Sequence, residues 1–186
     1  MQGSKVVKTF GINQADISAY TASVAATWVS IPIVGSGTLE LTVQEEDVRD
    51  GEGFLDTIWY HSLDASVSVV AKTWIMRVLE LITGNSVSSY SGTGAEAIHF
   101  GEASAITPPS VRLRMKVQAK DHNSSDATTY AWVYIFKATA SFPSFSMEEV
   151  TPNSMELNFR GLRVTDDDAG ATIAKAYGRL ELGSSS

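Results

Sequence analysis

The side chains of this chain that could do chemistry are those of histidine, serine, aspartate and glutamate. Their spacing in the sequence matches no catalytic or metal-binding motif. The histidines His61, His99 and His122 are far apart, and none has a partner at a metal-ligand spacing such as H-x-x-x-H. The chain also lacks G-x-S-x-G, G-x-x-x-x-G-K-[ST] and a helix-opening G-x-G-x-x-G. We therefore predict no metal, no cofactor and no activated serine.

Two acidic clusters deserve the same test. Glu148 and Glu149 are neighbours, so on a strand they point to opposite faces and cannot act as a glycosidase pair. The run 166–168 is Asp-Asp-Asp, without the alternating pattern of a calcium loop. Asp168 is instead expected to cap a short helix over residues 168–176, which Gly178 ends. We predict that the protein is not an enzyme.

Composition and net charge further limit the kind of protein that this sequence can encode. The chain has 186 residues, 44% of them hydrophobic, which is enough for a packed core. Its net charge is -7, from 14 basic and 21 acidic residues, which opposes general nucleic-acid binding. It has no cysteine, which excludes disulfides and thiolate metal sites. It also has no run of about 18 apolar residues that would indicate a membrane-spanning segment, so we expect no membrane among its partners.

Alternation of apolar and polar residues is the main structural signal. It predicts half-buried strands over residues 38–43, 111–120 and 155–159. The aromatic and β-branched run 130–138 predicts a central strand covered on both faces. Weaker strand candidates are 27–34, 57–62, 66–71 and 179–182.

One segment has a helical period. Apolar residues at 74, 75, 78, 79 and 82 form one stripe, with Thr73 as the expected N-cap and Gly84 as the stop. We predict a mostly β protein, a β-sandwich or barrel-like fold with one flanking helix at about 73–83 and long loops. A single domain spans 1–183, with an N-terminal arm over about 1–26 and a flexible tail at 184–186.

Two polar stretches are long for loops of a compact domain. The first, 44–53, is acidic, and the second, 84–109, is rich in Ser, Gly, Ala and Thr. Ordering such segments gains more when they pack against a neighbouring copy. The expected contacts between subunits or rings are Glu45, Glu46, Asp47, Asp50, Glu52, Tyr90, Ile98 and Phe100.

The strand 111–120 has a basic face. Arg112, Arg114, Lys116 and Lys120 alternate with apolar residues, and the segment holds no aromatic residue for stacking on nucleic acid. A solvated face is one interpretation. The other is an interface that meets the acidic stretch of an adjacent copy.

The order of these features resembles the major tail proteins, or tail tube proteins, of tailed bacteriophages. An L-E-L-T-V strand with an acidic run precedes a helix ending in V-L-E-L-I-T-G, a long loop, Pro108-Pro109 and the strand V-R-L-R. Phe145-Ser146-Met147 and M-E-L-N-F-R-G-L follow. The similarity covers about residues 38–182, and its most specific parts are the helix end and the late strand.

The resemblance implies a structural subunit that forms hexameric rings, which stack into the hollow tail tube of a virion. DNA would pass through the lumen without specific binding, and an acidic lumen would repel its backbone. Partners would be further copies of the chain and other tail proteins, such as the tape measure and tail terminator proteins. The subunit would be made in the host cytoplasm. Lumen candidates are the polar strand positions Glu40, Glu156 and Asn158.

Two alternatives remain open. The first is another phage particle component, such as a tail terminator or decoration protein, which binds as one ring or as separate copies. The second is a carbohydrate-binding β-sandwich, with Trp28, Trp59 and Tyr90 as the stacking residues.

Overall fold

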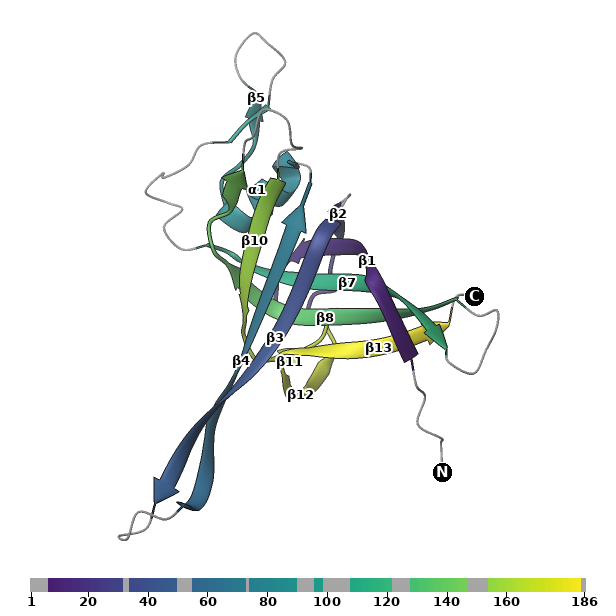
Figure 1. The fold of residues 1–186 in the computed structure, drawn as a ribbon. Coiled ribbons are helices and arrows are strands. Elements are labelled where there is room, and N and C mark those ends of the chain that lie inside the picture. The colour runs from purple at the N-terminus through teal and green to yellow at the C-terminus, as the bar shows by residue number, and fades with distance from the viewer. Residues whose placement is uncertain are drawn as a thin grey trace.

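The computed structural model describes residues 7–31, 34–49, 55–72, 74–89, 96–98, 108–121, 128–146 and 154–184. Within these ranges one helix accompanies a series of strands (Figure 1). The elements are β1 Val7–Ala19, β2 Val29–Ile31, β3 Val34–Arg49, β4 Leu55–Ala71, α1 Met76–Thr83, β5 Ser88–Ser89, β6 Glu96–Ala97, β7 Ser110–Asp121, β8 Thr128–Ala140, β9 Ser144–Ser146, β10 Ser154–Gly161, β11 Val164–Asp166, β12 Thr172–Ala176 and β13 Gly178–Ser184.

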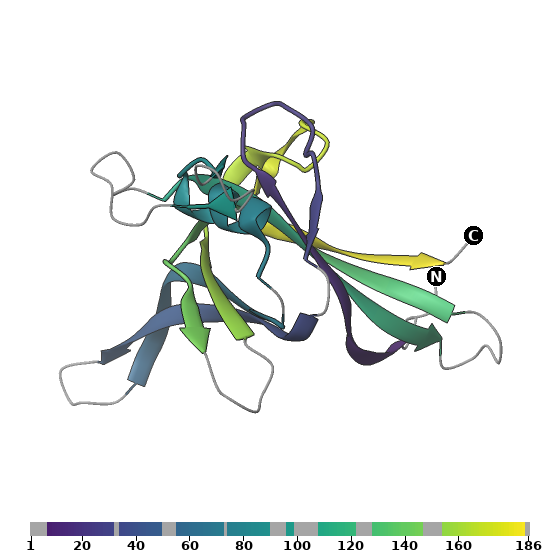
Figure 2. The same ribbon diagram turned by 90° about the horizontal axis from the view of Figure 1, so that it is seen from above.

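A large antiparallel sheet forks at β8. Its strand order is β2-β1-β7-β8-β10-β4-β3, with β13 also on β8 and β9 on β10. One edge of β8 carries β7, whereas the other edge is shared, since β13 pairs with residues 129–135 and β10 with residues 138–140. We call β2-β1-β7-β8-β13 the first limb and β10-β4-β3 the second limb. The two limbs run across one another (Figure 1) and diverge from the region of α1 (Figure 2).

The inner faces of the two limbs share one core. The alternation in the sequence explains it, because every second residue of β10, including Leu157, is buried while its neighbours are exposed. Leu113 of β7 and Val69 of β4 belong to the same cluster, as does the stripe of α1 at Val78, Leu79 and Ile82. The fold is therefore mostly β and sandwich or barrel-like with one helix, which confirms the predicted class.

The helix begins later than expected. Ile75 is its N-cap residue and makes no side-chain capping bond, so the prediction of a cap at Thr73, which lies outside the described residues, is wrong. The predicted end is confirmed: Gly84 has a left-handed φ of 75°, and its N–H donates to the Glu80 carbonyl at 2.9 Å. Packing of the apolar stripe thus holds the helix without an N-terminal side-chain cap.

The second predicted helix is wrong. Residues 164–176 form the β11–β12 hairpin, and Asp167, not a helix cap at Asp168, organises its turn. The Asp167 carboxylate accepts hydrogen bonds from the N–H groups of Ala169 and Ala171, each at 2.9 Å. Gly170 supplies a φ of 81°. Local side-chain bonding of this kind competes with helix formation.

The N-terminal segment was expected to be an arm, but residues 7–19 form β1 inside the first limb. β1 pairs with β7 along its length and with β2, and Ala15 and Ile17 are buried in the core. At the other end of the chain, Ser184 still belongs to β13.

The acidic stretch was expected to be a loop, and for residues 44–49 this is wrong. They continue β3, which pairs with β4 in a long hairpin up to Arg49 and Leu55. We call the part of this hairpin beyond Leu41 and Leu63 the arm. The arm leaves the body on the side away from α1 (Figure 1).

Candidate functional site

An apolar groove of about 640 Å³ opens where the arm leaves the body. Leu39, Leu41 and Leu63 at the base of the arm form one wall. Val133 of β8 and Leu180 of β13 stand on the opposite wall, with Ile135 deeper in the core. The groove is therefore the place where the inner faces of the two limbs separate, so strand alternation aims apolar side chains into it from both sides.

Leucines of this groove are unusually open to solvent. Leu180 is 66% exposed, Leu41 56% and Leu63 37%. Val43, which lies opposite Leu63 in the β3–β4 register, extends the apolar surface along the arm and is 47% exposed. A contiguous exposed apolar surface on a folded chain marks a place where another molecule binds.

The polar rim of the groove is cationic. Arg163, Lys175 and Arg179 line it together with Tyr177, whose hydroxyl donates to the Leu63 carbonyl and so ties the β12–β13 connection to the base of the arm. Arg179 is engaged by carboxylates, with Asp168 at 3.1 Å. Among the described residues, no carboxylate lies within ion-pair distance of Arg163 or Lys175.

The described lining offers little for catalysis. It contains guanidinium, ammonium and phenol groups but no carboxylate, histidine, serine or threonine. Such a set provides no nucleophile with an adjacent base. This lining is suited to bind a molecule whose surface is apolar and carries negative charge at its edge.

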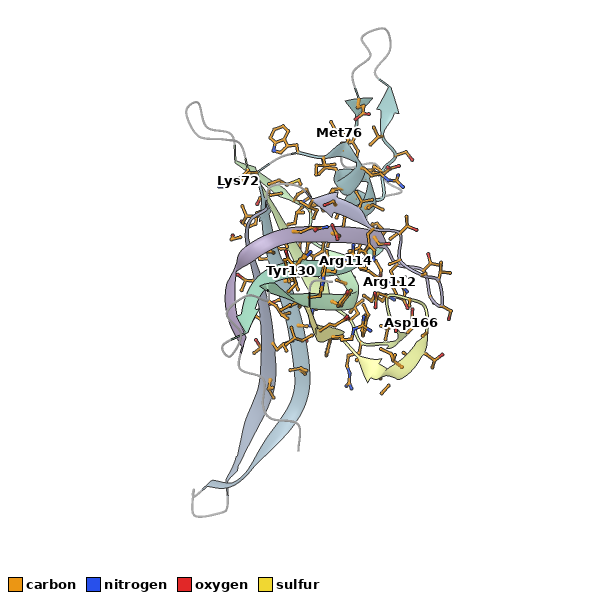
Figure 3. The ribbon with its side chains drawn as sticks, turned by 90° about the vertical axis from the view of Figure 1, so that its right-hand side faces the viewer. Lys72, Met76, Arg112, Arg114, Tyr130 and Asp166 are labelled. Carbon is orange, nitrogen blue, oxygen red and sulfur yellow. The ribbon has the colours of Figure 1, made fainter. Side chains whose placement is uncertain are left out.

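Arg112 lies on the other side of the first limb and is completely buried, at 0% exposure (Figure 3). Its Nη1 donates to the Val24 carbonyl at 2.6 Å, and its Nη2 donates to Thr21 at 3.1 Å and to Asp166 at 2.9 Å. The ring of Tyr20 lies 4.9 Å below the guanidinium. The expectation of a solvated or interface role is thus wrong for Arg112, because its charge is used inside its own chain.

Asp166 is the centre of this cluster. It accepts hydrogen bonds from the Tyr20 hydroxyl at 2.8 Å, from the Ser23 N–H at 3.3 Å and from Arg112. Burial on its own would raise the pKa of Asp166, but these hydrogen bonds and the charge of Arg112 outweigh it and hold the pKa below the usual value of an aspartate. Burial raises the pKa of Tyr20, and its bond to Asp166 adds to that rise. The cluster is a structural clamp that fastens the 20–28 loop and β11 to β7.

Arg114 and Lys116 follow Arg112 on the same face of β7, and each lies against aromatic rings (Figure 3 labels Arg114 and Tyr130). Arg114 pairs with Asp16 at 2.6 Å and stands between Trp28 and Trp132, at 4.6 and 4.8 Å from the ring centroids. Lys116 lies over Tyr130 at 3.8 Å, and over Trp132. On the face expected to be plainly basic, Asp16 therefore offsets the charge of Arg114, and aromatic rings of β8 and Trp28 cover both cations.

The remaining site predictions have mixed outcomes. Lys120 belongs to β7, but its side chain lies outside the described set, as do those of Glu45, Glu46, Asp47 and Trp59. Asp50, Glu52, Tyr90 and Phe100 also lie outside the described residues. Ile98 packs against the core of its own chain. Trp28, offered as a sugar platform, is occupied by Arg114.

The three lumen candidates come together on one surface. Glu40, Glu156 and Asn158 are exposed, and the registers place them on the outer face of the second limb, opposite Ser66, Val70 and Ser68 of β4. Asn158 donates to Glu156 at 3.1 Å. Whether this face lines a channel stays a prediction.

Sequence reasoning missed Tyr20, Asp166 and the groove residues Arg163, Lys175 and Leu180. Alternation in 179–182 signalled a strand with Leu180 on one face. The sequence around Leu180 could not indicate that this face is exposed, because the opposite wall of the groove comes from β3 and β4.

Within the described ranges, no group of three or more His, Asp and Glu side chains is arranged to hold a metal ion. No helix in the described part of the chain has the length and apolar character needed to cross a bilayer. Compared with known proteins, the chain matches no protein-family model and no curated protein.

Proposed function

We propose that the protein is a structural subunit that assembles with copies of itself, in the manner of the phage tail tube proteins that its sequence resembles. The observation that carries the proposal is the uncovered apolar groove at the base of the arm, with Leu41, Leu63 and Leu180 open to solvent. Burying such a surface against another subunit removes it from water, at about 25 cal/mol per Å² of apolar area.

The edges of the sheet support the same proposal. β3 has 16 residues and ends the strand order, and β13 pairs only with β8 among the described strands. Unpaired strand edges of this length are sites of association unless something protects them. A ring of identical subunits protects every such edge with one repeated contact.

In the proposed assembly, hexameric rings stack into a tube in the tail of a virion, and DNA travels along its lumen. The exposed polar face of the second limb, with Glu40, Glu156 and Asn158, has the chemistry of a lumen wall. Arg160 lies on the same face, but it pairs with Asp64 at 3.3 Å and carboxylates outnumber it there, so this face would hold phosphates only weakly. Tape measure and tail terminator proteins would be the partners at the inside and the end of the tube.

Electron microscopy of the purified protein tests the proposal. Long tubes of uniform diameter are expected as the concentration rises. Single small rings that never stack would favour a tail terminator or decoration protein, and a chain that stays monomeric at every concentration would overturn self-assembly altogether.

A further inference from the structure

We infer that the apolar groove is the receptor for the acidic arm of a second copy of this chain. This inference rests on the proposed self-assembly and names the two surfaces that meet. The first argument is chemical: the groove has apolar walls, and its rim carries Arg163 and Lys175, which pair with no described carboxylate, whereas Arg179 is engaged by Asp168. Its occupant must therefore combine apolar side chains with negative charge.

The end of the arm has this composition. Residues 45–52 carry five carboxylates and a single basic residue, Arg49. Large apolar residues follow in the sequence, namely Phe54, Leu55, Ile58 and Trp59, and the last three belong to β4. No other segment of the chain combines so many acidic residues with so many large apolar ones, which makes the arm complementary to the groove in charge and in polarity.

Geometry requires that this arm belong to another copy. Leu41 forms the wall of the groove, and residues 45–49 continue the same strand away from it. At about 3.4 Å per residue, positions 45 to 49 lie roughly 14 to 27 Å beyond Leu41. The chain's own arm thus runs away from its own groove, and Figure 1 shows this hairpin leaving the body.

A contact of this kind joins two different surfaces, so it is head-to-tail. Every copy that offers an arm still has an empty groove, and the contact repeats until a ring closes or a filament grows. The contact does not use the buried Arg112 or the cations Arg114 and Lys116, which serve their own chain.

Two variants separate the surfaces. Leu180→Glu places a charge in the groove at a position that is already exposed, so the fold should tolerate it. The triple change Glu45→Lys, Glu46→Lys and Asp47→Lys reverses the arm. Each is expected to raise the concentration at half-assembly by about 10- to 100-fold, the effect of losing one buried leucine or several complementary charges.

The decisive experiment mixes the two variants. The arm-reversed chain keeps a working groove and the Leu180→Glu chain keeps a working arm, so a head-to-tail contact predicts a 1:1 dimer that grows no further. Light scattering coupled to size-exclusion chromatography measures it. The matched control is Leu162→Glu, an exposed leucine outside the groove, which should assemble like the unaltered chain.

Charge reversal on both surfaces provides a second readout. Arg163→Glu with Lys175→Glu should block assembly alone and restore it when combined with the reversed arm. If Leu180→Glu assembles as well as the unaltered chain, or the mixed variants stay monomeric, the receptor role is overturned while self-assembly stands. A small apolar molecule as the natural occupant would give that same result.

If the unaltered chain never assembles, the proposed function fails first, and a peptide of residues 43–60 then tests the groove directly. Saturable binding of this peptide to the arm-reversed chain, lost in the Leu180→Glu chain, supports the inference. Absence of binding overturns it.

Discussion

Replacing the buried Arg112 by methionine tests the clamp between β7, β11 and the 20–28 loop. Methionine keeps much of the apolar stem but removes three hydrogen bonds, to Val24, Thr21 and Asp166. A bond between charged groups contributes about 1.5 to 3 kcal/mol and each carbonyl bond about 1 kcal/mol. Removing one partner of a buried ion pair also leaves the other charge uncompensated, so the total cost is about 3 to 5 kcal/mol.

Urea unfolding at a fixed protein concentration measures this cost, because assembly would otherwise add to the apparent stability. In thermal unfolding the same cost lowers the midpoint by roughly 6 to 20 °C for a chain of this length. Arg77→Met is the matched control, since the Arg77–Glu80 pair is exposed and worth under about 1 kcal/mol. A loss below about 1 kcal/mol for Arg112→Met would refute the clamp.

Three further predictions concern Asp166 of this clamp and two glycines elsewhere in the fold. The pKa of Asp166 is lowered in the folded state, so Asp166 stabilises the fold above about pH 4, the usual pKa of a free aspartate. This stabilisation is lost as the pH falls through the folded pKa. Asp166→Asn should therefore flatten the dependence of stability on acid pH in urea titrations. Gly178→Ala would place a Cβ 1.8 Å from the Tyr134 carbonyl oxygen and should cost at least about 2 kcal/mol. Gly35→Ala should cost less in calorimetry, because its Cβ would lie 3.2 Å from the flexible Lys72 side chain and 3.3 Å from the Val70 carbonyl oxygen. Gly84→Ala should lower helix stability by about 1 kcal/mol, seen as a lower midpoint by circular dichroism, because its φ is 75°.

Features with a local cause were predictable from the sequence. The alternation around Leu157 translates directly into burial on one face of a strand, and the stripe through Val78 and Ile82 translates into one face of a helix. Gly84 ends that helix because glycine reaches the left-handed region without strain.

Features with a distant cause were not predictable. Arg112 is buried because Asp166 and the Thr21 and Val24 carbonyls reach it, and the Asp166 contact is 54 residues away in sequence. The segment around Arg114 and Lys116 holds no aromatic residue, yet the neighbouring β8 supplies Trp132 in register. Pairing across strands, which no single segment records, decides what those charges do.

The groove could not be predicted from the sequence for the same reason. Its walls belong to strands from the first and last thirds of the chain, so neither segment alone reveals an uncovered surface. In residues 168–176, the turn around Asp167 overrode the weak helical pattern for a local reason that a closer account of turn chemistry would have caught.

The tie between Tyr177 and Leu63 joins residues 114 positions apart, and this separation has a consequence for the timing of assembly. At about 5 to 20 residues per second, roughly 6 to 23 seconds of synthesis separate the two sides of the tie. The β3–β4 hairpin closes on local contacts, whereas its receptor groove exists only after β13 has joined β8. In the proposed assembly, a chain that is still being synthesised would have an arm but no groove to bind the arm of another copy, so the order of translation would delay growth from incomplete subunits.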